Sequence, residues 1–154
     1  MKKVFLLILA AILISVTFSC KKDNSTTTPA TSFSVKVDGS VWTTSTITAI
    51  HVTGGGTTVT ATKGGSQVKY ILNIAGNTAG TYPLTNPNNI VTYWYGTNSI
   101  SSIYMDVPVG QIVVTTYDVS AKMISGTFYF DGEDQDGVIH HFTEGAFVNV
   151  PLAN

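Results

Sequence analysis

Arginine is absent from the 154-residue chain, and its eight basic residues are all lysines. Arginine is the usual side chain for bidentate recognition of phosphate, and phosphate contacts supply most of the non-specific affinity for nucleic acids. Only 11% of the residues are charged, and the formal net charge is −1. A slightly acidic chain without arginine is therefore not expected to bind nucleic acid or anionic lipid head groups.

Cysteine occurs once, so the chain cannot form an internal disulfide. There is no G-x-S-x-G nucleophile elbow, and no window after Cys20 has the 3.6-residue periodicity of an amphipathic helix. The glycine-rich stretch TGGGTT (53–58) joins two predicted strands, where glycine supplies turn geometry. We therefore predict no phosphate-binding loop, no cofactor and no enzymatic activity.

The first 19 residues have the layout of a secretory signal. Lys2 and Lys3 form a positively charged start, an apolar run covers 4–14, and small polar residues follow. A membrane-spanning helix needs about 20 apolar residues, which is more than this run provides. We therefore predict a helical signal peptide over residues 1–19 that is removed on maturation. An uncleaved membrane anchor is the alternative.

Cys20 follows this signal directly, in the stretch TFSC-KKDN (17–24). The stretch resembles the lipobox and early mature sequence of Bacteroidetes-type lipoproteins, although Thr17 and Phe18 depart from the strict lipobox. The resemblance implies that diacylglycerol alkylates the Cys20 thiol and that the protein is held at the outer membrane, on its periplasmic or its surface face. Each buried CH2 group adds about 0.8 kcal/mol, so two or three acyl chains would anchor it firmly. A plain secreted protein is the alternative.

The chain after the signal divides by composition into two parts. Residues 20–32 carry the cysteine and a small, polar, proline-containing stretch, which predicts a lipidated, disordered tether. Residues 33–154 alternate in polarity with period two and predict a single all-β domain of roughly ten short strands. The predicted strands cover 33–44 with a hairpin turn at Asp38-Gly39, then 46–52, 57–62, 66–74, 89–95, 100–107, 111–118, 124–131, 138–143 and 146–150.

An antiparallel sandwich and a partly closed barrel both fit this pattern, since both bury one face of each strand. A closed barrel would have room for an internal ligand. Four motifs stand out: D-G…W (38–42), GTYPL (80–84), YDVSAKMISGTFYF (117–130) and TEGAFVNVPL (143–152). Together they resemble an uncharacterised lipoprotein domain family of the same bacterial group. That family has no assigned activity, so the resemblance implies the fold and carries over no functional residue.

The stretch FDGEDQDGVIHHF (130–142) gathers four acids and two histidines. Clustered carboxylates suit a calcium ion, and the candidate ligands are Asp131, Glu133, Asp134 and Asp136. An EF-hand does not fit, because Gly132 replaces its first aspartate and Thr143 its bidentate glutamate. A solvated turn between two strands is the alternative.

The three histidines do not predict a zinc site. His140 and His141 are adjacent, and successive residues of a strand point to opposite faces of the sheet. Zinc needs three or four ligands, and the domain contains no cysteine to help. We expect surface or packing roles for both histidines and for His51, which lies on another predicted strand.

The stretch YWYG (93–96) is a candidate ligand-binding element. Alternation places Tyr93 and Tyr95 on one face of a strand and Trp94 on the other. An exposed aromatic ring can stack on a sugar or on a protein partner. Packing in the core or against a neighbouring strand is the alternative.

The sequence as a whole predicts a lipid-anchored cell-envelope protein with a binding or interaction role. Its expected partners are the membrane, through the lipid, and a protein or a glycan. The first alternative is a glycan- or lipid-binding barrel with an internal cavity. The second is a hydrolase that uses two carboxylates about 5–10 Å apart, drawn from Asp106, Asp118 and Glu144.

Overall fold

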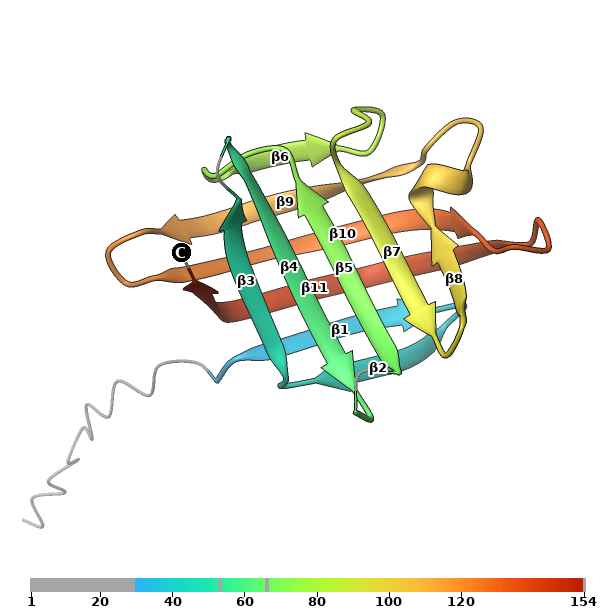
Figure 1. Ribbon diagram of the computed structural model, residues 1–154, viewed down its shortest axis with the longest axis horizontal. Coiled ribbons are helices and arrows are strands. Elements are labelled where there is room, and N and C mark those ends of the chain that lie inside the picture. Colours follow the sequence, from blue (N-terminus) through green and yellow to red (C-terminus); the bar gives the residue numbers. More distant parts are fainter. Residues whose placement is uncertain (1–29, 53, 66, 154) are drawn as a thin grey trace, which may run out of the picture.

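The computed structural model describes residues 30–52, 54–65 and 67–153. Within these ranges the chain forms eleven strands, one 3₁₀ turn and no α-helix (Figure 1). The elements are β1 (Ser32–Val37), β2 (Ser40–Thr44), β3 (Ile47–Val52), β4 (Gly56–Lys63), β5 (Val68–Ile74), β6 (Gly80–Pro83), β7 (Ile90–Tyr95), β8 (Asn98–Ser101), η1 (Ser102–Tyr104), β9 (Gly110–Asp118), β10 (Met123–Glu133) and β11 (Ile139–Ala153).

The predicted signal peptide (1–19) and the predicted lipidation site Cys20 lie outside the described residues, as does the predicted tether up to residue 29. Within the described ranges, no helix has the length and apolar character needed to cross a bilayer. Strand β1 begins one residue earlier than predicted. Just before it, the Thr31 hydroxyl donates a hydrogen bond to the carbonyl of Asn149 in β11 (2.9 Å).

The strands are arranged in two layers that face each other across the core (Figure 1). One layer contains β3, β4, β5, β7 and β8, and the other contains β2, β1, β11, β10, β9 and β6. Neighbouring strands are antiparallel, except that the end of β11 runs parallel to β3, with Leu152 opposite Ala49. At the other seam Glu133 of β10 pairs with Ser101 of β8. The predicted all-β fold is confirmed: the strands form one mixed 11-stranded sheet, folded into these two layers, that is not a closed barrel.

Three predicted boundaries were wrong. The predicted strand 100–107 ends at Ser101 and continues as the 3₁₀ turn η1. The predicted strands 138–143 and 146–150 are one continuous strand, β11, because the break between them is accommodated at Glu144 with a positive φ of 52°. The GTYPL motif, where no strand was predicted, contains the short strand β6, which pairs with β9.

Large apolar side chains fill the space between the two layers. They come from alternate strand positions, as in β5, where Tyr70, Leu72 and Ile74 are buried, which is the expected pattern for strands with one buried face. Phe130 of β10 stacks on Phe142 of β11 with ring centroids 4.1 Å apart. The largest fully buried rings are Tyr70, Phe33, Phe130, Phe142 and Phe147.

The predicted Asp-Gly hairpin joins β1 to β2. Asp38 and Gly39 both have positive φ (47° and 83°), and Val37 pairs with Ser40 on either side of them. Positive φ at both central residues is the requirement of a type I′ turn. The hairpin brings Trp42 edge-on against Phe33, with ring centroids 5.6 Å apart. The D-G…W motif is therefore structural: it shapes the turn and covers the core.

Tyr70 carries a buried hydroxyl that is not satisfied within the described part of the chain. Its side chain is fully buried, stacks on Tyr93 (4.6 Å between ring centroids) and contacts Trp42 (4.8 Å). The Tyr70 hydroxyl has no hydrogen-bond partner among the described residues. Burial raises the pKa of this phenol, so the group stays neutral.

Replacing Tyr70 with Phe is expected to stabilise the domain. The change keeps the ring and removes a polar atom that is buried without a hydrogen bond, so the free energy of unfolding should rise by about 1 kcal/mol. Urea unfolding followed by fluorescence measures this change. Tyr93→Phe, which alters a half-buried neighbour, should leave the free energy unchanged. A lower stability of Tyr70→Phe would show that the hydroxyl makes a stabilising contact.

Candidate functional site

The outward-facing side chains of β3, β4, β5, β7 and β8 form a broad surface, which we call the outer face. The strand register aligns Thr48 of β3 with Thr60 of β4. Thr60 in turn lies opposite Ile71 of β5, and Ile71 lies opposite Thr92 of β7. The full set is Thr48, Ile50, Val52, Thr58, Thr60, Thr62, Lys69, Ile71, Asn73, Ile90, Thr92 and Trp94. Ser99 and Ser101 of β8 lie on the same side of the layer but are buried.

The outer face is polar but almost uncharged. Most of its hydroxyls arise from alternation in the sequence TTVTATK (57–63), which buries Val59 and Ala61 and turns Thr58, Thr60 and Thr62 outward. Lys69 is the one charged side chain in the set, and its ammonium group lies 5.3 Å from the centroid of the Trp94 ring. Such a surface favours neutral ligands with many hydroxyl groups.

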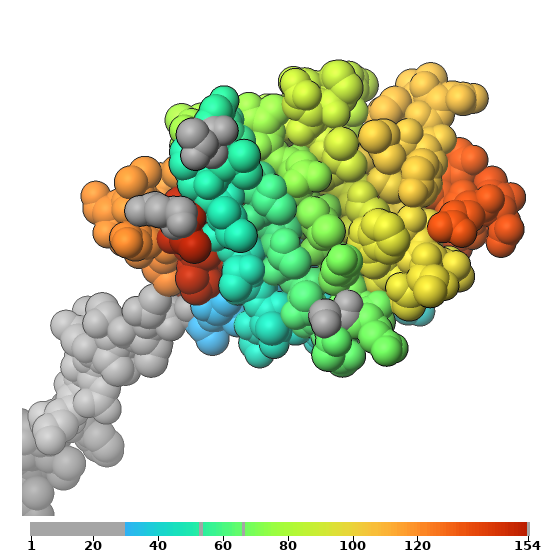
Figure 2. Space-filling view, in the orientation of Figure 1, coloured from blue at the N-terminus to red at the C-terminus, as the bar shows by residue number. Residues whose placement is uncertain are grey.

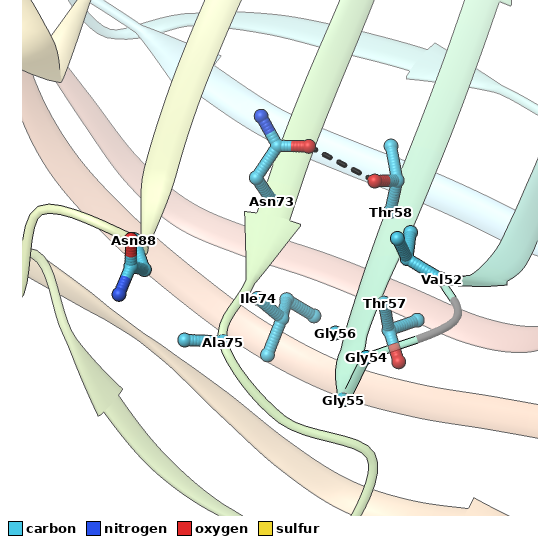
Figure 3. Close-up of a pocket in the computed structure, with 10 residues that line it drawn as sticks. All are labelled: Val52, Gly54, Gly55, Gly56, Thr57, Thr58, Asn73, Ile74, Ala75 and Asn88. Carbon is cyan, nitrogen blue, oxygen red and sulfur yellow. Dashed lines mark hydrogen bonds between the residues drawn. The ribbon is translucent and has the colours of Figure 1, made fainter.

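A groove of about 400 Å³ opens at one end of the outer face, where β4 and β5 meet the loops that flank them (Figure 3). At its rim the Thr58 hydroxyl donates a hydrogen bond to Oδ1 of Asn73 (3.0 Å). Gly54 and Gly55 have φ values of 112° and 108°, which side-chain-bearing residues rarely adopt. The lining residues are Val52, Gly54, Gly55, Gly56, Thr57, Thr58, Asn73, Ile74, Ala75 and Asn88.

The aromatic stretch of β7 is divided between the two faces of its layer. Tyr93 and Tyr95 point inward and pack against the core, with Tyr93 between Tyr70 and Tyr95. Trp94 is half-buried and points to the outer face, opposite Lys69 on one side and Ser99 on the other. Of the three predicted ligand-binding residues, the structure therefore presents Trp94 on the outer face and packs the two tyrosines against the core.

A second aromatic side chain borders the Trp94 end of the outer face. The turn η1 folds over β8, so that the Tyr104 hydroxyl lies 3.1 Å from the Ser99 hydroxyl, directly opposite Trp94. Ser101 caps the turn by accepting a hydrogen bond from the Ile103 amide. Tyr104 was not predicted as a site residue, because the sequence pattern placed it in the strand 100–107.

The predicted calcium ligands are spread along the β10–β11 hairpin. Asp131 and Glu133 lie in β10, while Asp134 and Asp136 lie in the turn that follows. Asp134 accepts hydrogen bonds from the amides of Asp136 and Val138 (3.0 and 2.9 Å). No group of three or more His, Cys, Asp or Glu side chains in the described ranges is arranged to hold a metal ion. Calcium binding here stays a prediction of the sequence.

The same hairpin carries a histidine that joins two distant turns. Nδ1 of His140 lies 2.7 Å from Oδ2 of Asp38 in the β1–β2 turn, and its Nε2 lies 3.3 Å from Oδ2 of Asp134. His141 points elsewhere, with Nδ1 2.8 Å from Asp131. The two histidines thus contact different carboxylates, as expected for adjacent strand residues. We call the contact of Asp38, His140 and Asp134 the histidine bridge.

Hydrogen bonds shift the pKa values of all three residues of the histidine bridge. Hydrogen bonding to Asp38 is the main cause that raises the pKa of His140. The pKa of Asp38 is lowered chiefly by the backbone amide of His141, and that of Asp134 by the amide of Val138. Both ring nitrogens of His140 are engaged by carboxylates, an arrangement that favours the protonated form of the ring.

The histidine bridge predicts a stability that declines above mildly acidic pH. A raised histidine pKa stabilises the fold below 6.5 and loses this effect as the pH rises through the folded-state value. The lowered aspartate pKa values stabilise it above 3.8 and lose this effect as the pH falls through theirs. Thermal unfolding across this range should show the highest stability between these limits. In His140→Gln the melting temperature should fall less between pH 6 and pH 8 than in the wild type. An identical fall in the two proteins would contradict the prediction.

His51 lies away from the other two histidines. Its Nδ1 is 3.2 Å from the Tyr117 hydroxyl of β9, and the buried Thr57 hydroxyl is 3.4 Å from the same oxygen. His51 and Tyr117 border a small pocket of about 250 Å³ together with Asn77, Val119 and Leu152. His51 therefore links the two layers through Tyr117, a packing role of the kind expected from the sequence.

The acids considered for hydrolysis lie on different elements with different neighbours. Glu144 of β11 forms an ion pair with Lys36 of β1 (2.6 Å). Asp118 accepts a hydrogen bond from the Ala121 amide in the β9–β10 turn (2.8 Å), and Asp106 lies in the loop after η1. The structure thus associates Glu144 with a lysine and Asp118 with a turn amide.

The described chain is thus an all-β sandwich domain with one polar, nearly uncharged outer face. It belongs to a family described as a domain of unknown function (DUF6252), whose family model matches residues 29–151. This match confirms the predicted membership of an uncharacterised domain family. No curated protein and no solved structure shows a significant match to the chain.

Proposed function

We propose that this protein is a lipid-anchored, non-enzymatic binding module of the cell envelope, and that its outer face binds a neutral glycan. The observation that carries the proposal is the composition of the outer face. A half-buried tryptophan and rows of threonine hydroxyls occupy the face with Lys69 as its one charged side chain. Aromatic rings stack on the apolar faces of sugars, and hydroxyl and amide groups supply the polar contacts that fix a ligand's orientation.

The dimensions of the outer face suit a short oligosaccharide. Lys69, which lies beside Trp94, is four residues along β5 from Asn73 at the groove. At about 3.3 Å per residue this separation is roughly 13 Å. A glycan stacked on Trp94 would extend across Ile71 and Thr60 towards the Asn73 amide. The groove shown in Figure 3 would receive the other end of the glycan.

The proposed site is on the outer surface because side chains occupy the space between the layers. Phe33, Tyr70, Phe130, Phe142 and Phe147 are all buried there. A lipocalin-like interior would need an enclosed space lined by the inward-facing residues. We therefore propose that the glycan binds to the outer face and not in an internal cavity.

Trp94→Ala is expected to weaken oligosaccharide binding by at least about tenfold, since each 1.4 kcal/mol lost corresponds to a factor of ten. Isothermal titration against a panel of neutral gluco-, manno- and xylo-oligosaccharides measures the effect. Tyr129→Ala is the matched control, because Tyr129 is an exposed aromatic residue on the other layer. An unchanged melting temperature would show that Trp94→Ala keeps the fold.

Salt provides a second criterion for the proposed glycan. A neutral ligand held by stacking and hydrogen bonds should bind equally at low and high ionic strength, because salt screens only interactions between charges. The absence of heat across the whole neutral panel would refute glycan binding. Binding that vanishes in high salt would instead point to a charged ligand at Lys69.

A further inference from the structure

The end of the sandwich formed by residues 102–109 and the β10–β11 hairpin exposes several large apolar side chains. Ile103 and Val107 are 60% and 71% exposed, and Val138 and Ile139 at the hairpin tip are each 51% exposed. The Asp131 amide of the hairpin donates a hydrogen bond to the Val109 carbonyl of the segment (3.0 Å), and Glu133 pairs with Ser101, just before the segment. Figure 2 shows the two segments, in gold and orange-red, side by side at one end of the molecule. We call this surface the apolar end.

A pocket of about 420 Å³ opens at the apolar end, between η1 and the loop that connects β6 to β7. Its polar side chains are largely occupied by the fold. Asn89 accepts a hydrogen bond from the Ala75 amide and donates one to the Pro83 carbonyl, and Ser102 accepts one from the Val91 amide. The apolar lining consists of Leu84, Pro87, Ile90, Ile103, Met105 and Pro108.

Asp106 is the one charged side chain among the residues that line this pocket. Asp106 is exposed at its edge and has no ion-pair partner among the described residues. Six of the eight acids in the described ranges lie at this end: Asp38, Asp106, Asp131, Glu133, Asp134 and Asp136. Three of them contact histidines, Asp38 and Asp134 at His140 and Asp131 at His141, so the acids at this end outnumber the histidines by six to two. The described lysines are engaged or lie elsewhere, at Lys36 beside Glu144, Lys63 over Trp42, Lys69 over Trp94 and Lys122 in the β9–β10 turn.

We propose that the apolar end is a docking surface for a protein segment that carries both lysine or arginine and a large apolar side chain. The apolar side chain would enter the pocket beneath Ile103, and the adjacent cation would face Asp106. A buried apolar anchor surrounded by complementary charge is the usual arrangement of an energetically important contact. Exposed apolar patches of this kind mark interaction sites.

The surface is also well placed to reach a partner. The described chain begins at the opposite end of the molecule from the β10–β11 hairpin (Figure 1). A domain attached through its N-terminal side would therefore direct the apolar end away from its point of attachment. This pocket and the outer face adjoin at Ile90, which belongs to both.

Fluorescence anisotropy with a labelled nine-residue peptide of alternating lysine and leucine tests the proposal on the purified protein. Two matched peptides replace the leucines with serine or the lysines with glutamate. We expect the lysine–leucine peptide to bind at least about tenfold more tightly than either control peptide. The double variant Ile103→Ser and Val107→Ser should lose at least about tenfold in affinity, and Asp106→Asn about threefold. Both changes are at exposed positions, so the melting temperature should be preserved.

Asp118→Asn is the matched control, because it removes an exposed acid at the other end of β9 and should not change the affinity for the peptide. Trp94→Ala should likewise leave peptide binding unchanged, which separates this proposal from glycan binding. Equal binding of the serine peptide, or full affinity in the double variant, would overturn the apolar docking site. A dimer of this chain in sedimentation analysis that the double variant dissociates would also overturn it, because the occupant would then be a second copy.

Discussion

Gly126→Ala is expected to destabilise the domain by roughly 3 kcal/mol, the upper end of the cost of overpacking a close-packed interior. Gly126 lies in β10, where a Cβ would overlap both the Val113 carbonyl oxygen and the Phe147 ring. One of these neighbours belongs to the backbone of β9 and the other is a fully buried side chain. Neither can move without disturbing the packing of β10 between β9 and β11.

Urea unfolding of the purified domain measures this loss, with Gly80→Ala as the matched control. Gly80 is also a strand glycine, in β6, but the nearest atom to its added Cβ is 3.9 Å away on the Tyr82 ring, an ordinary contact. The control should therefore unfold close to the wild-type midpoint. Equal midpoints for both variants would show that β10 and β11 have room that the structure does not give them.

Cys20→Ala is expected to abolish incorporation of radiolabelled fatty acid and to move the protein from the membrane fraction to the soluble fraction. The proposed attachment depends on a single thiol, and the chain has no other cysteine to replace it. Each acyl chain contributes about 0.8 kcal/mol for each buried CH2 group, so removing all of them removes essentially all of the membrane affinity.

Ser25→Ala, in the predicted tether, is the control for lipidation, because it changes one nearby polar residue and leaves the proposed modification site intact. Its label and its fractionation should match those of the wild type. The melting temperature of the Cys20→Ala domain should also be unchanged, since the position lies outside the described strands. Labelled or membrane-bound Cys20→Ala protein would rule out the proposed anchor.

Local sequence patterns were sufficient for most of the fold. The two-residue turn at Asp38-Gly39 and the alternation of β4 and β5 are properties of neighbouring residues, so they were predictable from the sequence. The strand break predicted at residues 144–145 was wrong, and it too was inferred from neighbouring residues alone. Glu144 adopts a positive φ while β11 continues beyond it, and irregularities of this kind depend on the partner strand.

The candidate sites were harder to predict from the sequence, because they depend on contacts between residues that are far apart in the chain. His140 and Asp38 are 102 positions apart, and nothing in the composition of either turn indicates that they meet. The threonine rows of the outer face are a partial exception. Thr58, Thr60 and Thr62 alternate with buried residues, so one row was predictable, but its alignment with β5 and β7 required the register of three strands.

The position of β11 has a consequence for the timing of folding. This strand lies late in the chain, yet it pairs with β1 and β10 in one layer and with β3 in the other. Pairings over such long separations form slowly, because closing a long loop costs entropy before the contacts compensate for it. A nascent chain that lacks β11 cannot join its two layers along this seam. It should therefore stay loosely structured until β11 has been synthesised.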